Sequence, residues 1–92
     1  MDDYARNVSL TVGTSAVQIS PMRNRSEIVV TNTGTTNITL SFGQPATVAG
    51  AGVFLVPYAV YFASTAQGFT VSNQELYAVS SLAGGSVAVF ER

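Results

Sequence analysis

The sequence predicts an all-β domain, either a small antiparallel β-sandwich or a jelly-roll-like barrel of about eight short strands, with no significant helix. Several short segments alternate apolar and polar residues, which is the periodicity of half-buried strands. Turn residues such as glycine, proline and asparagine interrupt the chain about every eight to twelve residues, as they do in sandwiches and barrels. No apolar pattern recurs at helical spacing over a useful length.

The first half of the chain contains four of the expected strands, each bounded by turn residues: 8–12, 16–20, 27–31 and 37–42. The strand 27–31 is apolar on both faces near its middle, which favours a central or interface-facing position. Residues 32–36 should join it to the next strand as a hairpin, with Gly34 supplying a positive φ. Residues 22–26 are the most polar stretch and are expected to form an exposed loop.

The most apolar stretch, Val53–Phe62, lies within a run of 47 residues without a charged side chain, Ile28 to Gln74. Its β-branched and aromatic residues predict a buried pair of strands. Pro57 has no N–H for a strand ladder, so the stretch should break there into two short strands or bend at the edge of a sheet. The remaining expected strands are 69–71, 75–80 and 86–90, and Gly85 should permit a positive φ in the turn before the last strand.

The composition indicates one small domain with few charges for its surface. Residues 1–7 form an expected N-terminal arm, and residues 8–92 form the sandwich domain. Of the 92 residues, 47% are hydrophobic and 10% are charged, against about 25% charged in an average domain. Part of the uncharged surface is therefore expected to be covered by a neighbour, most simply another copy of the chain. A monomer coated with hydroxyl and amide groups is the alternative.

Enzymatic and metal-binding functions are not expected, because the chain has no histidine, lysine or cysteine. General acid–base catalysis and activated nucleophiles depend largely on such groups, so no catalytic residue is predicted. A carboxylate pair of Glu27 and Glu75 is the one glycosidase-like alternative, and lone surface glutamates are the ordinary interpretation. Zinc favours histidine and cysteine, and calcium favours clustered carboxylates, so no metal or cofactor site is predicted.

Nucleic-acid and membrane partners are not expected either. The net charge of −1, with scattered arginines, leaves no basic face. The acidic N-terminus lacks the apolar segment of a signal peptide. The stretch Val48–Ala66 is apolar enough to resemble a membrane span, but its glycines, Pro57 and strand-favouring residues argue against a spanning helix.

Two groups of residues are candidates for an interface. Tyr58 and Tyr61, with Phe54 and Phe62, could form an aromatic platform for a partner protein or a sugar, since aromatic side chains with a polar tip are favoured at interfaces. Core packing is the alternative for these aromatics. Arg23 and Arg25 could pair with acidic groups on a neighbour, and a solvated loop is the alternative.

A series of strand and turn motifs recurs in a recognisable order between about Val8 and Phe90. The motifs are Arg25-x-x-Ile28-Val29-Val30-Thr31-Asn32-Thr33-Gly34, Ile38-x-Leu40-x-Phe42-Gly43, Gly52-x-x-Leu55-x-Pro57, Leu76-Tyr77-Ala78-Val79-Ser80 and Val87-x-Val89. This order resembles the small β-sandwich structural proteins of tailed bacteriophages, which decorate capsids or form head fibres. Where those proteins often have glycine after the proline, this chain has Tyr58.

The resemblance implies a non-enzymatic virion protein, made in the host cytoplasm, that self-associates, commonly as a trimer. Its implied partners are copies of itself and the major capsid protein or another virion protein. The N-terminal arm, with Asp2, Asp3, Tyr4 and Arg6, would then be the capsid anchor. The alternative function is a carbohydrate-binding or adhesin module that uses Tyr58 and Tyr61 as stacking platforms.

Overall fold

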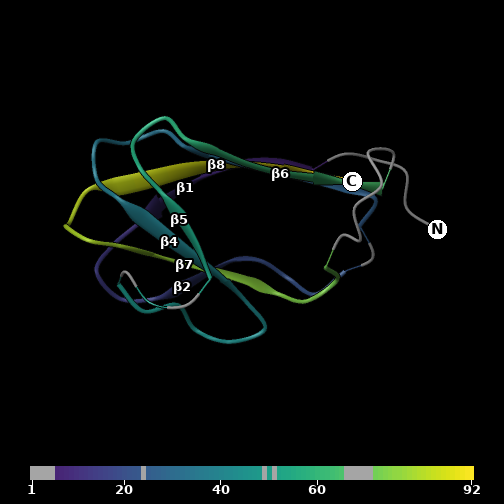
Figure 1. Cartoon of the computed structure of the whole chain (residues 1–92), viewed down its shortest axis with the longest axis horizontal. Coiled ribbons are helices and arrows are strands. Elements are labelled where there is room, and N and C mark those ends of the chain that lie inside the picture. The colour runs from purple at the N-terminus through teal and green to yellow at the C-terminus, as the bar shows by residue number, and fades with distance from the viewer. Residues whose placement is uncertain (1–5, 24, 49, 51, 66–71) are drawn as a thin grey trace.

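The computed structural model describes residues 6–23, 25–48, 50, 52–65 and 72–92, which form a two-layer sandwich of antiparallel strands (Figure 1). The eight strands are β1 (Arg6–Val12), β2 (Val17–Ser20), β3 (Glu27–Asn32), β4 (Ile38–Phe42), β5 (Val53–Leu55), β6 (Val60–Ser64), β7 (Leu76–Ser80) and β8 (Gly85–Glu91). The all-β prediction is confirmed. Within the described ranges, no helix is long and apolar enough to cross a membrane.

The strands divide into two four-stranded sheets. Sheet 1 has the order β1-β8-β3-β6, and sheet 2 has the order β2-β7-β4-β5. The chain passes back and forth between the sheets, so that only β4 and β5 are both consecutive and hydrogen-bonded to each other. This order of eight strands in two sheets is that of a jelly roll. The structure thus decides between the two architectures that the sequence left open.

The connection between β3 and β4 is not the hairpin that the sequence predicts. β3 pairs with β6 and β8, whereas β4 pairs with β5 and β7, so residues 33–37 cross from one sheet to the other. Gly34 does not have the positive φ that was expected there. In the β7–β8 connection, the residue with a positive φ is Gly84 (φ 89°) and not Gly85. Gly85 is needed for close packing instead, because a Cβ there would lie 2.8 Å from the Val12 carbonyl oxygen.

The core lies between the sheets and follows the predicted alternation along most strands. Its fully buried members come from six strands and are Val12, Ile19, Ile28, Val30, Ile38, Leu40, Leu76, Ala78, Val87 and Val89, with Leu55 and Ala63 nearly so. Val8 and Leu10 pack against this core, as expected for strand β1. In β2, Ile19 is buried but Val17 is exposed, and the ladder is irregular between Gln18 and Ser20.

The stretch Val53–Phe62 divides at Pro57, as predicted, but its halves are not a buried pair of strands. β5 forms one edge of sheet 2 and β6 forms one edge of sheet 1. Odd-numbered residues face the core, and every second residue from Phe54 to Phe62 is exposed. We call these five residues, Phe54, Val56, Tyr58, Val60 and Phe62, the edge stripe.

The two outer faces of the sandwich differ in how they are covered. On sheet 2, Thr39 and Val79 point away from the core, yet each is only 2% exposed. The β4–β5 connection passes beneath this sheet in Figure 1, and its Ala46 is buried, so the charge-free loop packs against the domain. On sheet 1, the corresponding outward residues of β3 and β8, such as Val29 and Phe90, remain partly exposed.

Strand β1 begins at Arg6, two residues before the expected strand 8–12. Arg6 and Asn7 pair with Glu91 and Phe90 of β8, so both belong to sheet 1 rather than to an arm. The expected strand 69–71 lies outside the described residues, as do Asp2, Asp3 and Tyr4 of the expected arm.

Candidate functional site: an assembly surface between two polar ends

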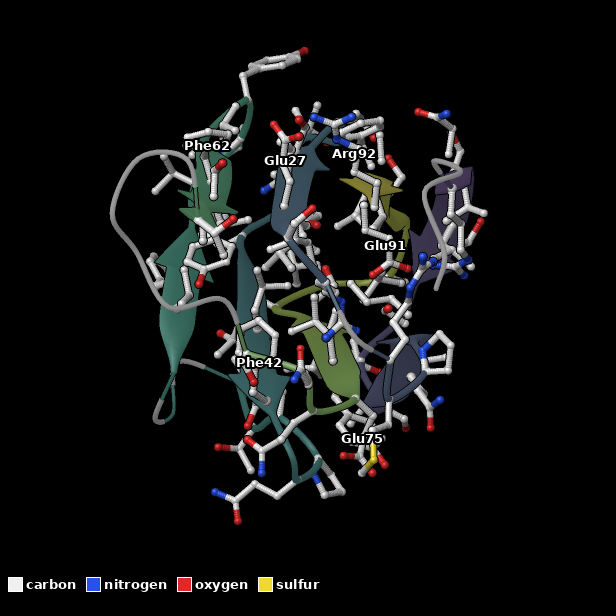
Figure 2. All side chains as sticks on the ribbon, turned by 90° about the vertical axis from the view of Figure 1, so that its right-hand side faces the viewer. Glu27, Phe42, Phe62, Glu75, Glu91 and Arg92 are labelled. Carbon is white, nitrogen blue, oxygen red and sulfur yellow. The ribbon has the colours of Figure 1, made fainter. Side chains whose placement is uncertain are left out.

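One end of the sandwich is closed by a buried carboxylate. Along β8, Val87, Val89 and Glu91 face the core in turn, and Glu91 is fully buried. Its Oε1 accepts a hydrogen bond from Arg25 Nε at 2.6 Å, and its Oε2 accepts one from Arg6 Nη1 at 2.5 Å. Ser20 Oγ lies 2.8 Å from both carboxylate oxygens. Figure 2 shows Glu91 pointing between the two sheets.

Arg25 is buried beside this carboxylate, which corrects the expectation of an exposed loop for this residue, whereas Met22 and Ser26 of the same stretch are exposed as predicted. All five of its N–H groups are used within the chain. Besides the bond to Glu91, Nη1 donates to the carbonyls of Ser72 and Gln74, and Nη2 donates to Ser20 Oγ and the Pro21 carbonyl. Arg25 is therefore not available to an acidic group on a neighbour. It joins the β2–β3 connection to the segment that leads into β7.

Arg23 differs from Arg25. Its side chain is 18% exposed, and its Nη1 lies 3.8 Å from Glu91 Oε2. The backbone of Arg23 is held by a bond from its N–H to the Asn73 carbonyl. Of the two arginines expected at an interface, only Arg23 keeps a guanidinium that solvent reaches.

The pKa of the Glu91 carboxyl results from opposing effects. Burial raises the pKa, but hydrogen bonds from Arg25, Ser20 and Arg6 favour the charged form more strongly, and the pKa lies below its ordinary value. Glu91 is therefore ionised in the folded protein at neutral pH.

The free energy of unfolding is expected to fall as the pH is lowered below about 5. The pKa of Glu91 is lower in the folded than in the unfolded chain. Ionised Glu91 therefore contributes fully to the free energy of unfolding above its unfolded pKa, about 4.3, and this contribution is lost as the pH falls towards the folded pKa. Urea titrations at several pH values between neutrality and pH 3 measure this, with Glu27→Gln as a control that keeps the same dependence. An unfolding free energy that does not change over this range would contradict the role of Glu91.

The opposite end of the sandwich is closed by Asn32, the last residue of β3, which is also fully buried. Its Nδ2 donates to the Thr36 carbonyl at 2.8 Å and to the Leu55 carbonyl at 3.0 Å, and its Oδ1 accepts from the Gly34 N–H. Its backbone carbonyl accepts from the Tyr58 N–H at 2.8 Å. Asn32 thus holds the β3–β4 and β5–β6 connections together.

Tyr58 occupies a strained backbone position at the centre of the edge stripe. It is the one non-glycine residue with a positive φ in the described part of the chain, at 67°, and it is 73% exposed. An L-residue in this left-handed region costs about 1–2 kcal/mol. The Tyr58 side chain is therefore held at a cost in backbone stability.

Tyr58→Gly is expected to raise the free energy of unfolding by about 1 kcal/mol, because glycine takes this φ without steric cost and the tyrosine ring buries little surface. A gain of this size raises the melting temperature of a domain of this length by about 4–8 °C. Tyr58→Ala is the matched control, since it shortens the side chain but keeps the Cβ. Equal melting temperatures for the glycine and alanine variants would contradict the strain at Tyr58.

The other predicted aromatic residues do not form one platform with Tyr58. Phe54 is exposed at the edge of sheet 2. Tyr61 faces the core opposite Val30, and its ring lies 6.1 Å from that of Phe42. A sugar platform made by Tyr58 and Tyr61 together is therefore not formed. Among the described residues, no group of histidine, cysteine, aspartate and glutamate side chains is placed to hold a metal ion.

The outer face of sheet 1 carries a partly exposed apolar surface. Register places Asn7, Phe90, Val29 and Phe62 in one row across the four strands, and Ser9, Ala88, Thr31 and Val60 in the next row. An open hollow of about 340 Å³ lies over β1, β8 and β3 in these rows. We call this surface, with these eight residues, the open face.

Of the comparisons with known proteins, that with solved structures bears on the architecture. No protein-family model and no curated protein matches the sequence. The fold is similar to that of a Bacillus endospore appendage protein. That protein belongs to a family described as disulfide-linked pili; the TM-score is 0.54 at 12% identity, over 96% of this chain and 84% of that one. At this level of identity the similarity shows the shared β fold.

The buried roles of Glu91 and Asn32 were not predicted from the sequence. Both residues continue the inward phase of their strands, Asn32 after Ile28 and Val30, and Glu91 after Val87 and Val89. A polar residue in phase with buried residues at a strand end was the available signal, since such a residue needs a buried partner. Counting strand phase to the last residue would have found both.

Proposed function

We propose that this chain is a non-enzymatic structural subunit that assembles with copies of itself, and that the assembly is part of a virus particle. The open face carries this proposal. Five of its eight residues are apolar, no segment among the described residues covers it, and the opposite face of the sandwich is covered by the chain itself. An exposed apolar surface of this kind usually marks a contact with another protein.

Composition and similarity support the same proposal. The chain has neither histidine nor lysine, and its acid nearest the core, Glu91, is fully engaged in ion pairs and hydrogen bonds. The protein of similar fold belongs to a family described as disulfide-linked pili. Because this chain has no cysteine, its copies must be held by non-covalent contacts rather than by disulfides. The virion is proposed from the resemblance to phage capsid proteins.

The oligomeric state of the purified chain tests self-assembly. Sedimentation velocity over a range of concentrations should show species larger than the 9.6 kDa monomer, growing with concentration. Electron microscopy of the same samples, and of mixtures with phage capsids that lack their decoration proteins, distinguishes fibres from a capsid-bound layer. A chain that remains monomeric at millimolar concentration and does not bind to capsids would overturn the proposal.

A further inference from the structure

We infer that two copies of this chain pack through their open faces, related by a two-fold axis that passes between β8 and β3. The inference rests on the proposed function, because it names the surface through which the self-assembling subunit makes one of its contacts. In such a contact, β8 of one copy lies over β3 of the other, and β1 lies over β6.

The shape of the open face suits this pairing. The hollow lies over β1, β8 and β3, where Asn7, Ser9 and Ala88 are small or polar. The other side of the face is raised by Val60 and Phe62 on β6, both exposed. Because the order is β1-β8-β3-β6, a two-fold rotation about the centre places the apolar ridge of each copy over the hollow of the other. The same surface thus supplies both the projection and the recess.

The charge of the open face also favours a second copy. Among the described residues, its only charged neighbours are Glu27 and Arg92 at one end, and they form an ion pair with each other at 3.0 Å. Figure 2 shows these two residues and Phe62 on the side of sheet 1. No net charge is left to repel a copy, and none selects a strongly basic or acidic partner.

The spacing between packed sheets suits the side chains of the open face. Aligned sheets that pack face to face lie about 10 Å apart, and side chains the size of Phe62 and Val60 fill that spacing.

The experiment compares two substitutions of the same residue type on opposite faces. Phe62→Lys places a charge on the ridge of the open face, and Phe54→Lys places one on the outer side of sheet 2. The two phenylalanines are similarly exposed, at 44% and 51%, and both lie on edge strands. Neither is part of the core, so thermal denaturation should show that both variants fold.

Phe62→Lys is expected to weaken self-association by about 100-fold in sedimentation equilibrium, because each dimer would bury two unpaired ammonium groups. Phe54→Lys is expected to associate like the wild type. Equal association of Phe62→Lys and the wild type, or a loss seen only with Phe54→Lys, would overturn this interface while leaving self-assembly intact. A wild-type chain that never associates would overturn the interface together with the proposed function.

Discussion

Arg25→Met is expected to lower the free energy of unfolding by about 3–5 kcal/mol, the usual cost of removing one partner from a buried ion pair. The substitution leaves the Glu91 carboxylate buried with Ser20 and the more distant guanidinium of Arg23, and with Arg6 on one oxygen only. It also removes the donors to the Ser72, Gln74 and Pro21 carbonyls. A domain with a total stability of about 5–15 kcal/mol would then be only marginally folded. Urea denaturation monitored by tyrosine fluorescence measures the loss.

The control for this prediction is the exposed ion pair at the same end of the sandwich. Arg92→Met breaks the ion pair with Glu27. Solvent reaches both side chains, so the substitution should change the free energy of unfolding by less than about 1 kcal/mol. The double variant Arg25→Met/Glu91→Leu removes both buried charges and should be more stable than Arg25→Met alone, because no unpaired carboxylate remains. Strictly additive losses from the two substitutions would contradict the coupling of Arg25 and Glu91.

Asn32→Ala is expected to lower the free energy of unfolding by about 3 kcal/mol, because two buried carbonyls and one partly buried N–H lose their hydrogen-bond partner. The groups are the carbonyls of Thr36 and Leu55 and the N–H of Gly34. The β3–β4 and β5–β6 connections should loosen together, so amide hydrogen exchange at Tyr58 and Gly34 should accelerate before the rest of the sheet is affected.

Asn37→Ala is the matched control for Asn32. Asn37 lies in the same connection, is only half-buried, and takes part through its backbone carbonyl, which accepts from the Ser81 N–H. Its truncation should change stability by less than about 0.5 kcal/mol. Equal effects of the two asparagine substitutions, or unchanged exchange at Tyr58 in Asn32→Ala, would contradict the role of the Asn32 side chain.

Local patterns were sufficient to predict the strands of this fold but not their pairing. Alternation along residues 8–12 and 37–42 is set by which side chains enter the core, and it can be read from the chain. Pairing depends on partners far away in the sequence, such as Val29 with Phe62 and with Phe90. The turn at residues 32–36 resembles a hairpin in composition, yet it crosses between sheets, because short polar turns serve both geometries.

The polar residues show the same limit. Arg25 lies in the most polar stretch of the sequence, which favours an exposed loop. It is nevertheless buried, because it pairs with a carboxylate 66 residues further along the chain. Only the fold brings Glu91 to it. The exposure of the edge stripe could not be predicted from apolar composition either. Strands β5 and β6 lie at sheet edges, and composition alone does not distinguish an edge strand from a central one.

The most direct test is whether the centres of the open faces of two copies lie in contact in the assembly. The chain has no cysteine, so Ala88→Cys gives a single thiol on β8, next to Thr31 of β3 and beside the proposed two-fold axis. At concentrations where the wild type associates, a short bis-maleimide should link Ala88→Cys into covalent dimers and leave Phe54→Cys monomeric. Efficient covalent dimers from Phe54→Cys and none from Ala88→Cys would contradict the contact between two open faces.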